Sequence, residues 1–198
     1  RLTPELRDAT VGSSLPRTIR ICAEHAGISV DEADYQRYRA FMLGRVAELF
    51  DGVLAPNPGV VPLLAELAEQ KVTMLVTTNT ERSLAARCID VVGRNYFTDS
   101  ITGDEVTNPK PAPDMYLEAA RRVGLPPSEC LVFEDSFNGM IAAVEAGCRV
   151  IGLHPEEVTP PEGVVPLREL HGSDTFEGVD AEMINTWFDQ IAPAVLPN

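Results

Sequence analysis

The sequence predicts an α/β protein in which a parallel sheet covered by helices follows an all-helical segment. Three observations lead there. Residues 1–56 show only helical periodicity, helix-like and strand-like stretches alternate from Val60 onward, and polar residues stand where several expected strands end. Such alternation is typical of a parallel sheet with both faces covered. We therefore expect a helical unit over residues 1–56 and an α/β core over residues 57–198, divided by the break at Asn57-Pro58-Gly59.

The N-terminal unit is expected to contain two amphipathic helices. The first ends at Gly27, and the second can be capped by Asp31. Both are predicted from apolar residues that recur on one helical face. In the first helix these are Leu15, Ile19, Cys22 and Ala26, and in the second Tyr35, Tyr38, Met42, Val46 and Leu49 or Phe50.

In the core, helices and strands are expected to follow one another in turn. Expected helices cover residues 60–70, 81–92, 114–123, 138–146 and 181–191, and expected strands cover residues 71–77, 100–103, 131–133 and 149–153. Asp114 should cap its helix and Gly124 should end it. The proline-rich residues 155–166 are predicted to form a surface loop.

Composition limits the classes of partner. The 198 residues carry a formal net charge of −14, which argues against nucleic acid and anionic membranes. No apolar run approaches the ~20 residues that a membrane span needs. A small phosphorylated metabolite is compatible with this charge, because a metal ion and one lysine can reverse its sign locally. We expect a monomer or weak dimer.

The four cysteines show neither CxxC pairing nor zinc-ligand spacing. We interpret them as buried free thiols of a cytoplasmic protein, because reducing compartments keep thiols unpaired. They are Cys22, Cys88, Cys130 and Cys148.

An apolar run over residues 130–133 leads directly into Glu134 and Asp135. A buried strand that ends in two like charges needs compensation, and carboxylate oxygens are ligands that Mg²⁺ prefers. The alternative is that both acids open a helix, where the positive end of the helix dipole favours them. This stretch alone does not distinguish the two interpretations.

Two further polar features follow expected strands. Thr77-Thr78-Asn79 joins a strand to a helix, where a hydroxyl and free backbone N–H groups can hold a phosphate; an ordinary helix cap is the alternative. Lys110 stands among Pro109, Pro111 and Pro113, which fix the backbone and suggest that its ammonium meets an anion. A stiff loop with an incidental lysine is the other interpretation. Because parallel strands bind ligands at their carboxyl ends, we expect these features to converge with Glu134-Asp135 on a phosphate and Mg²⁺ site.

These motifs resemble those of haloacid dehalogenase-superfamily phosphatases, in the β-phosphoglucomutase-like subfamily with a helical cap. The resemblance spans about residues 57–153 and implies a Rossmann-like parallel-sheet core with a small α-helical cap domain. Its motifs are Leu75-Val76-Thr77-Thr78-Asn79, Lys110-Pro111-Ala112-Pro113-Asp114-Met115-Tyr116, and Val132-Phe133-Glu134-Asp135-Ser136-Phe137-Asn138-Gly139 with Ala142, Ala143, Ala146 and Gly147.

The resemblance implies a role for each matching residue. Thr78 and Asn79 would bind phosphate, and Thr78 and Lys110 would be catalytic. Lys110 would also contact the substrate and stabilise the nucleophile and the phosphoryl charge. Glu134 and Asp135 would be the Mg²⁺ ligands. The hinge between cap and core would lie near Pro58-Gly59.

One motif of the family does not occur. Its aspartate nucleophile belongs to an Asp-x-Asp-Gly-Thr sequence on a central strand, and Asp51-Gly52-Val53 follows no buried strand and does not match it. We expect a few tens of residues upstream of Arg1 to carry that motif. A core without its central strand would lose more free energy than the marginal stability of most domains allows. The alternatives are a cleaved chain and a natural pseudoenzyme, inactive if the chain begins at Arg1.

The resemblance then implies a Mg²⁺-dependent phosphatase that acts on a small phosphomonoester, such as a sugar phosphate or phosphoglycolate, through an aspartyl phosphate. Arg17 and Arg45 are candidate substrate contacts from the cap. A β-phosphoglucomutase-like phosphotransferase is an alternative, although Leu15 replaces the arginine that this family carries after the serine. A second alternative is a non-catalytic phosphate-binding module. A dehalogenase proper is disfavoured, because it would leave the Glu-Asp pair without a use.

Overall fold

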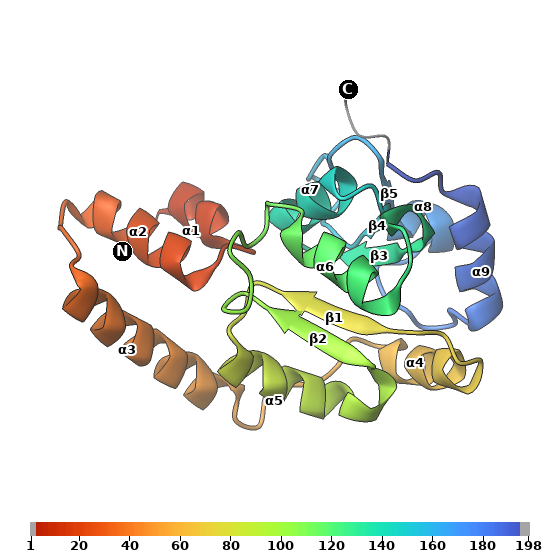
Figure 1. Ribbon diagram of the computed structural model, residues 1–198, viewed down its shortest axis with the longest axis horizontal. Helices are drawn as coiled ribbons and strands as arrows, with labels where there is room; N and C mark the ends of the chain where they lie inside the picture. The colour runs from red at the N-terminus through yellow and green to blue at the C-terminus, as the bar shows by residue number, and fades with distance from the viewer. Residues whose placement is uncertain (1–2, 195–198) are drawn as a thin grey trace.

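The computed structural model describes residues 3–194, and its first part is entirely helical (Figure 1). The helices are α1 (Pro4–Thr10), α2 (Leu15–Ala26) and α3 (Glu32–Phe50). Both predicted helices are confirmed. Gly27 ends α2 in the left-handed conformation with φ 66°, and Asp31 caps α3 by accepting a hydrogen bond from the Asp34 N–H at 2.8 Å.

Helices and strands alternate through the rest of the chain, so the predicted α/β fold class is confirmed. The elements in order are α4 (Val60–Glu69), β1 (Leu75–Thr78), α5 (Arg82–Val92), η1 (Arg94–Tyr96), β2 (Asp99–Thr102), α6 (Asp114–Val123), η2 (Pro127–Glu129), β3 (Leu131–Glu134), α7 (Phe137–Glu145), β4 (Arg149–Gly152), β5 (Val164–Pro166), α8 (Leu167–His171) and α9 (Ala181–Gln190).

All pairing between these strands is parallel, in two groups. β1 pairs with β2, and β3, β4 and β5 form a second sheet in that order. α6 lies over the first sheet in Figure 1, and α7 and α9 flank the second. The ends of β1 and β3 lie close together although the strands belong to different sheets, because Lys110 contacts both Thr77 at the end of β1 and Glu134 at the end of β3.

Two apolar clusters of buried side chains are associated with the second sheet. The larger joins α4, α8 and α9 to the sheet, and Phe133 packs edge-on against Phe176 with ring centroids 5.5 Å apart. The smaller lies under α7 and includes Tyr116, Val132, Met140, Ala142, Ala143, Ala146, Cys148, Val150 and Val164. The sheet edge that carries β3 is therefore fixed from both faces.

Three sequence predictions about the core are wrong in detail. The first strand begins at Leu75 instead of residue 71, because Lys71 has φ 60° and belongs to a turn. Asp114 is the first residue of α6, not its cap, and its carboxylate accepts a hydrogen bond from Asn108 Nδ2 at 2.9 Å. The proline-rich loop contains a short strand, β5, since Val164 to Pro166 pair with β4.

Pro58 and Gly59, where a hinge between cap and core was expected, are anchored to the core. The Phe176 N–H donates to the Pro58 carbonyl at 3.0 Å. Gly59 has φ 82°, and a Cβ there would lie 2.0 Å from the carbonyl carbon of Phe176, so only glycine fits. A hinge near this pair stays a prediction.

The four cysteines are all free, but burial was predicted correctly only for Cys148; the other three are partly exposed. Of the helices within residues 3–194, none combines the length and the apolar character that crossing a membrane requires.

Candidate active site

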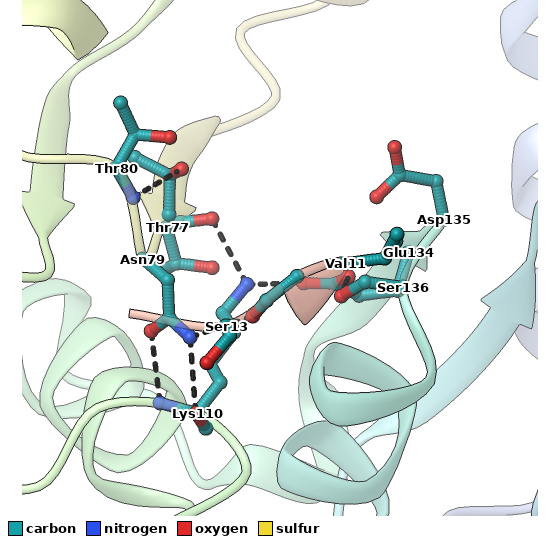
Figure 2. A pocket seen from close by; sticks show the side chains of 11 residues that line it. Val11, Ser13, Thr77, Asn79, Thr80, Lys110, Glu134, Asp135 and Ser136 are labelled. Carbon is teal, nitrogen blue, oxygen red and sulfur yellow. Dashed lines mark hydrogen bonds and ion pairs between the residues drawn. The ribbon is translucent and has the colours of Figure 1, made fainter. Parts of the chain in front are cut away.

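The three polar segments meet at one cavity of about 340 Å³ (Figure 2). It is formed by the loop between α1 and α2, the end of β1, the loop before α6 and the end of β3. Its lining residues are Val11, Gly12, Ser13, Thr77, Thr78, Asn79, Thr80, Lys110, Glu134, Asp135 and Ser136.

Lys110 and Glu134 form a buried ion pair at this cavity, and their side chains are only 5% and 8% exposed. The Lys110 ammonium also donates to the Thr77 carbonyl at 3.0 Å and to the Tyr116 hydroxyl at 2.9 Å. An ammonium has three N–H donors, and each has a partner here. The lysine therefore joins the end of β1 to the end of β3.

Tyr116 completes this buried group, because its hydroxyl donates to the same Glu134 oxygen that pairs with Lys110. Burial, followed by the neighbouring Glu134 charge, raises the pKa of Tyr116 well above its usual value. The phenol thus stays protonated and holds the carboxylate. Tyr116 belongs to the motif that begins at Lys110, but no role for it was predicted from the sequence. Its position six residues after Lys110, on the buried face of α6, was the available signal.

Glu134 is further confined by the start of α7. Ser136 Oγ lies 3.2 Å from its second oxygen and accepts from the Gly139 N–H at 3.1 Å, which caps the helix. A Cβ at Gly139 would lie 1.9 Å from Glu134 Oε2. Because no side chain fits there, the Gly139 position sets how closely the helix approaches the carboxylate.

Asp135 behaves differently from its neighbour. It is exposed, and in Figure 2 its carboxylate points away from Lys110. The surrounding protein still removes part of the hydration of this carboxylate, and this loss, followed by the Glu134 charge, raises the pKa of Asp135, while Lys110 lowers it. One carboxylate is therefore tied inside the protein and the other faces the cavity.

These two carboxylates fit a Mg²⁺ ion, which in phosphoryl-transfer sites takes one or two protein carboxylates and completes its shell with water and phosphate oxygens. Glu134 could present Oε2, since Lys110 and Tyr116 engage Oε1. Within the described part of the chain, no group of three or more His, Cys, Asp or Glu side chains is placed to hold a metal ion. A Mg²⁺ ion held by Glu134 and Asp135 would take its remaining ligands from water and phosphate oxygens.

The loop after β1 is a compact turn. Thr78 Oγ1 accepts from the Thr80 N–H at 3.1 Å. Asn79 Nδ2 donates to the Gly12 carbonyl at 2.8 Å and to the Lys110 carbonyl at 3.0 Å, while its Oδ1 accepts from the Lys110 N–H at 2.9 Å. Both hydrogens of the Asn79 side-chain amide are used, so this side chain joins the loop after β1 to the turn at Gly12 and to the Lys110 backbone.

Comparison with known proteins agrees with this arrangement. Residues 16–147 match the family described as haloacid dehalogenase-like hydrolase. The chain belongs to this family. Protein CbbY of Rhodobacter capsulatus is 40% identical over 132 residues, covering 65% of this chain and 55% of CbbY. Hexitol phosphatase A of Escherichia coli (strain K12) is 32% identical over 110 residues, covering 56% of this chain and 51% of that protein. The chain thus spans about half the length of these curated relatives.

Solved structures show the same haloacid dehalogenase-like fold. β-Phosphoglucomutase from Clostridium difficile has a TM-score of 0.82 at 18% identity, covering 96% of this chain and 83% of that one. CbbY from Rhodobacter sphaeroides in complex with phosphate has a TM-score of 0.73 at 23% identity, covering 92% and 83%. The resemblance and the fold predicted from the sequence motifs are therefore confirmed.

The structure brings together Thr78, Asn79, Lys110, Glu134 and Asp135 at the cavity of this haloacid dehalogenase-like chain.

It does not bring the two predicted cap arginines there. Arg17 is exposed on α2, and Arg45 pairs with Glu48 at 2.7 Å on α3. Neither lines the cavity. The N-terminal unit contributes Val11, Gly12 and Ser13 instead, from the turn between α1 and α2.

Proposed function

We propose that the protein is a Mg²⁺-dependent phosphatase of a small phosphorylated metabolite, a sugar phosphate or phosphoglycolate. The observation that carries this proposal is the buried Lys110 at the junction of the Thr78–Thr80 loop and the Glu134-Asp135 pair. Names of relatives support the class: hexitol phosphatase A and fructose-1-phosphate phosphatase YqaB of Escherichia coli, the latter 41% identical over 75 residues.

The phosphate would lie against the loop after β1. Backbone N–H groups of this loop, the Thr78 hydroxyl and the N-terminal end of α5 offer hydrogen-bond donors to an anion. The Lys110 ammonium supplies a fixed positive charge nearby. Because Thr77, Tyr116 and Glu134 all hold that ammonium, it needs little rearrangement when negative charge develops on the phosphoryl oxygens.

Glu134 and Asp135 are the residues that would hold Mg²⁺. The ion supplies Lewis-acid stabilisation of the phosphoryl oxygens when bound. Tyr116, Ser136 and Gly139 position the Glu134 carboxylate for this role.

The proposed reaction also needs the aspartate nucleophile of the family's Asp-x-Asp-Gly-Thr motif, which does not occur in residues 1–198. Its carboxylate would form a bond to phosphorus while the bond from phosphorus to the ester oxygen breaks, and the leaving oxygen would take a proton from water to become the alcohol. Water would then release inorganic phosphate and restore the carboxylate. Lys110 would stabilise both the carboxylate and the transferring group.

Replacement of Lys110 tests the proposal directly. We would express the protein from its full gene and assay a panel of sugar phosphates and phosphoglycolate with Mg²⁺. Lys110→Ala should abolish turnover. The chain has one other lysine, Lys71, which is exposed in a turn, so Lys71→Ala is a matched control that should keep full activity.

The outcomes separate the alternatives. Turnover by Lys110→Ala within a few-fold of the parent would refute the role of this lysine. If the parent binds phosphate with Mg²⁺ but hydrolyses no ester, the non-catalytic binding module replaces the phosphatase. Formation of an isomeric sugar phosphate without release of inorganic phosphate would identify a phosphotransferase.

A further inference from the structure

An ion pair joins the N-terminal helical unit to the residue that follows the phosphate-binding loop. Arg39 of α3 forms two hydrogen bonds with the Glu81 carboxylate, one from Nε to Oε1 at 2.9 Å and one from Nη2 to Oε2. The two residues are 42 positions apart in the sequence. Two parallel bonds of this kind fix the relative orientation of the groups as well as their distance.

Glu81 is a buried acidic residue at the start of α5. It is the N-cap residue of α5, yet its side chain makes no capping hydrogen bond. The carboxylate is turned toward Arg39 instead, and it is only 7% exposed, against 36% for the arginine. A buried carboxylate that makes no capping bond needs another hydrogen-bond partner. Among the described residues, Arg39 is the side chain that hydrogen-bonds to it.

A second contact fastens the same short segment to the N-terminal unit. Asn79, two residues before Glu81, donates to the Gly12 carbonyl. The turn at Gly12 is pressed against the core, since a Cβ there would lie 2.5 Å from Ser136 Cβ. Residues 79–81 are therefore held by the helical unit at two points.

Asn79 also connects this segment to the catalytic lysine. Its side chain bonds to both the N–H and the carbonyl of Lys110. A displacement of the helical unit would break the bonds from Asn79 to Gly12 and from Arg39 to Glu81. The loops that carry Thr78 and Lys110 would then lose part of what fixes their positions.

We propose that Arg39 and Glu81 are positioning residues that hold the helical unit closed over the site and keep the Thr78–Glu81 loop in its binding geometry. The effect on turnover rests on the proposed phosphatase function. The pair forms only when the helical unit is docked, because the two residues lie on different units and α3 must approach α5 for them to meet.

The burial of Glu81 decides how strongly the pair should act. Surface ion pairs contribute little, whereas removal of one partner of a buried pair leaves an uncompensated charge. Because Glu81 is buried and Arg39 is partly exposed, the effect should lie between that of a surface pair and that of a buried pair. Loss of Arg39 should therefore raise the ratio of open to closed molecules by about ten-fold.

The test compares four variants: Arg39→Gln, Glu81→Gln, the double variant, and Arg37→Gln as control. Arg37 lies on the same helix and pairs with Asp34 at 2.8 Å, but its side chain is 68% exposed. The set excludes Arg39→Glu, because Asp104 lies close enough to raise the pKa of the Arg39 guanidinium. Asp104 would therefore repel a carboxylate at position 39, and this repulsion would add to the loss of the ion pair.

Hydrogen exchange of peptides covering residues 11–16 and 77–81, with Mg²⁺ and inorganic phosphate present, measures closure without any turnover. Arg39→Gln should raise exchange about ten-fold in both peptides and lower kcat/KM by a similar factor, while Tm falls by only about 3–5 °C relative to Arg37→Gln. The double variant should be no worse than Arg39→Gln, because the two residues act as a pair.

Exchange equal to that of the Arg37→Gln control, or additive losses in the double variant, would overturn the proposal. If no variant hydrolyses any ester, the phosphatase assignment fails while the exchange result still decides whether the pair closes the unit.

Discussion

Lys110 is held by three groups that come from three parts of the sequence. Thr77 ends β1, Tyr116 lies on α6 and Glu134 ends β3. A lysine fixed in this way cannot sample the rotamers of a surface side chain, so its charge is available at one place. The same arrangement makes the residue important for stability.

Lys110→Ala should lower the free energy of unfolding by about 3 kcal/mol, because it leaves the Glu134 carboxylate buried without its cation. Urea denaturation followed by circular dichroism measures this. Adding Glu134→Gln to Lys110→Ala should restore part of the loss by removing the unpaired charge. A double variant that is less stable than Lys110→Ala would contradict this explanation.

Cys148 should be the least reactive of the four thiols. It is 1% exposed, and burial raises its pKa to about 12. At pH 8 only about one molecule in 10⁴ would then carry the thiolate, which is the reactive form. Mass spectrometry after brief iodoacetamide treatment of the folded protein should find Cys148 modified last. Labelling of Cys148 as fast as partly exposed Cys22 would refute this order.

At the scale of elements, the junction of β3 with α7 combines a helix cap and a candidate metal ligand. Ser136 caps α7 through the Gly139 N–H and lies beside Glu134, so one hydroxyl contributes to both. The cap and the ligand position cannot be changed independently.

Ser136→Ala should lower the free energy of unfolding by about 1 kcal/mol, the usual cost of losing an N-cap hydroxyl. It should also weaken Mg²⁺ binding, because Glu134 loses a neighbour that orients it. Calorimetric titration with Mg²⁺ and thermal unfolding measure the two effects. Ser83→Ala, at an exposed position near the start of α5, is the control and should change neither. Equal results for the two variants would remove Ser136 from the site.

How far the elements could be predicted depends on the range of the interaction that forms them. Local signals sufficed for α2 and α3, where Gly27 and Asp31 mark the boundaries. β5 was missed because Val164–Pro166 becomes a strand only by pairing with β4, and no local periodicity announces it.

The same distinction applies to the candidate site. Its motif residues were predicted because polar groups at the ends of parallel strands must share an edge. The contacts of Tyr116 with Glu134 and of Arg39 with Glu81 join residues 18 and 42 positions apart, and no spacing rule connects them. Arg17 and Arg45 were predicted as substrate contacts from their positive charge alone. Charge does not specify which face of its helix a residue occupies.

At the scale of the whole molecule, the site draws on both units, so a ligand bound there should stabilise their docking. Gly12 and Ser13 from the helical unit face Thr78, Lys110 and Asp135 from the core across one cavity. Ligands that bind only the folded, closed form raise the free energy of unfolding in proportion to the logarithm of their concentration.

Mg²⁺ with inorganic phosphate, each at about 100 times its Kd, should therefore stabilise the protein by about 2.7 kcal/mol for each site filled. For a chain of 198 residues this corresponds to a rise in Tm of about 5–10 °C. Differential scanning fluorimetry with and without EDTA measures the shift. Lys71→Ala should retain it, and Lys110→Ala should lose most of the phosphate-dependent part. A phosphate-dependent shift that survives in Lys110→Ala would place the anion away from this lysine and away from the cavity described here.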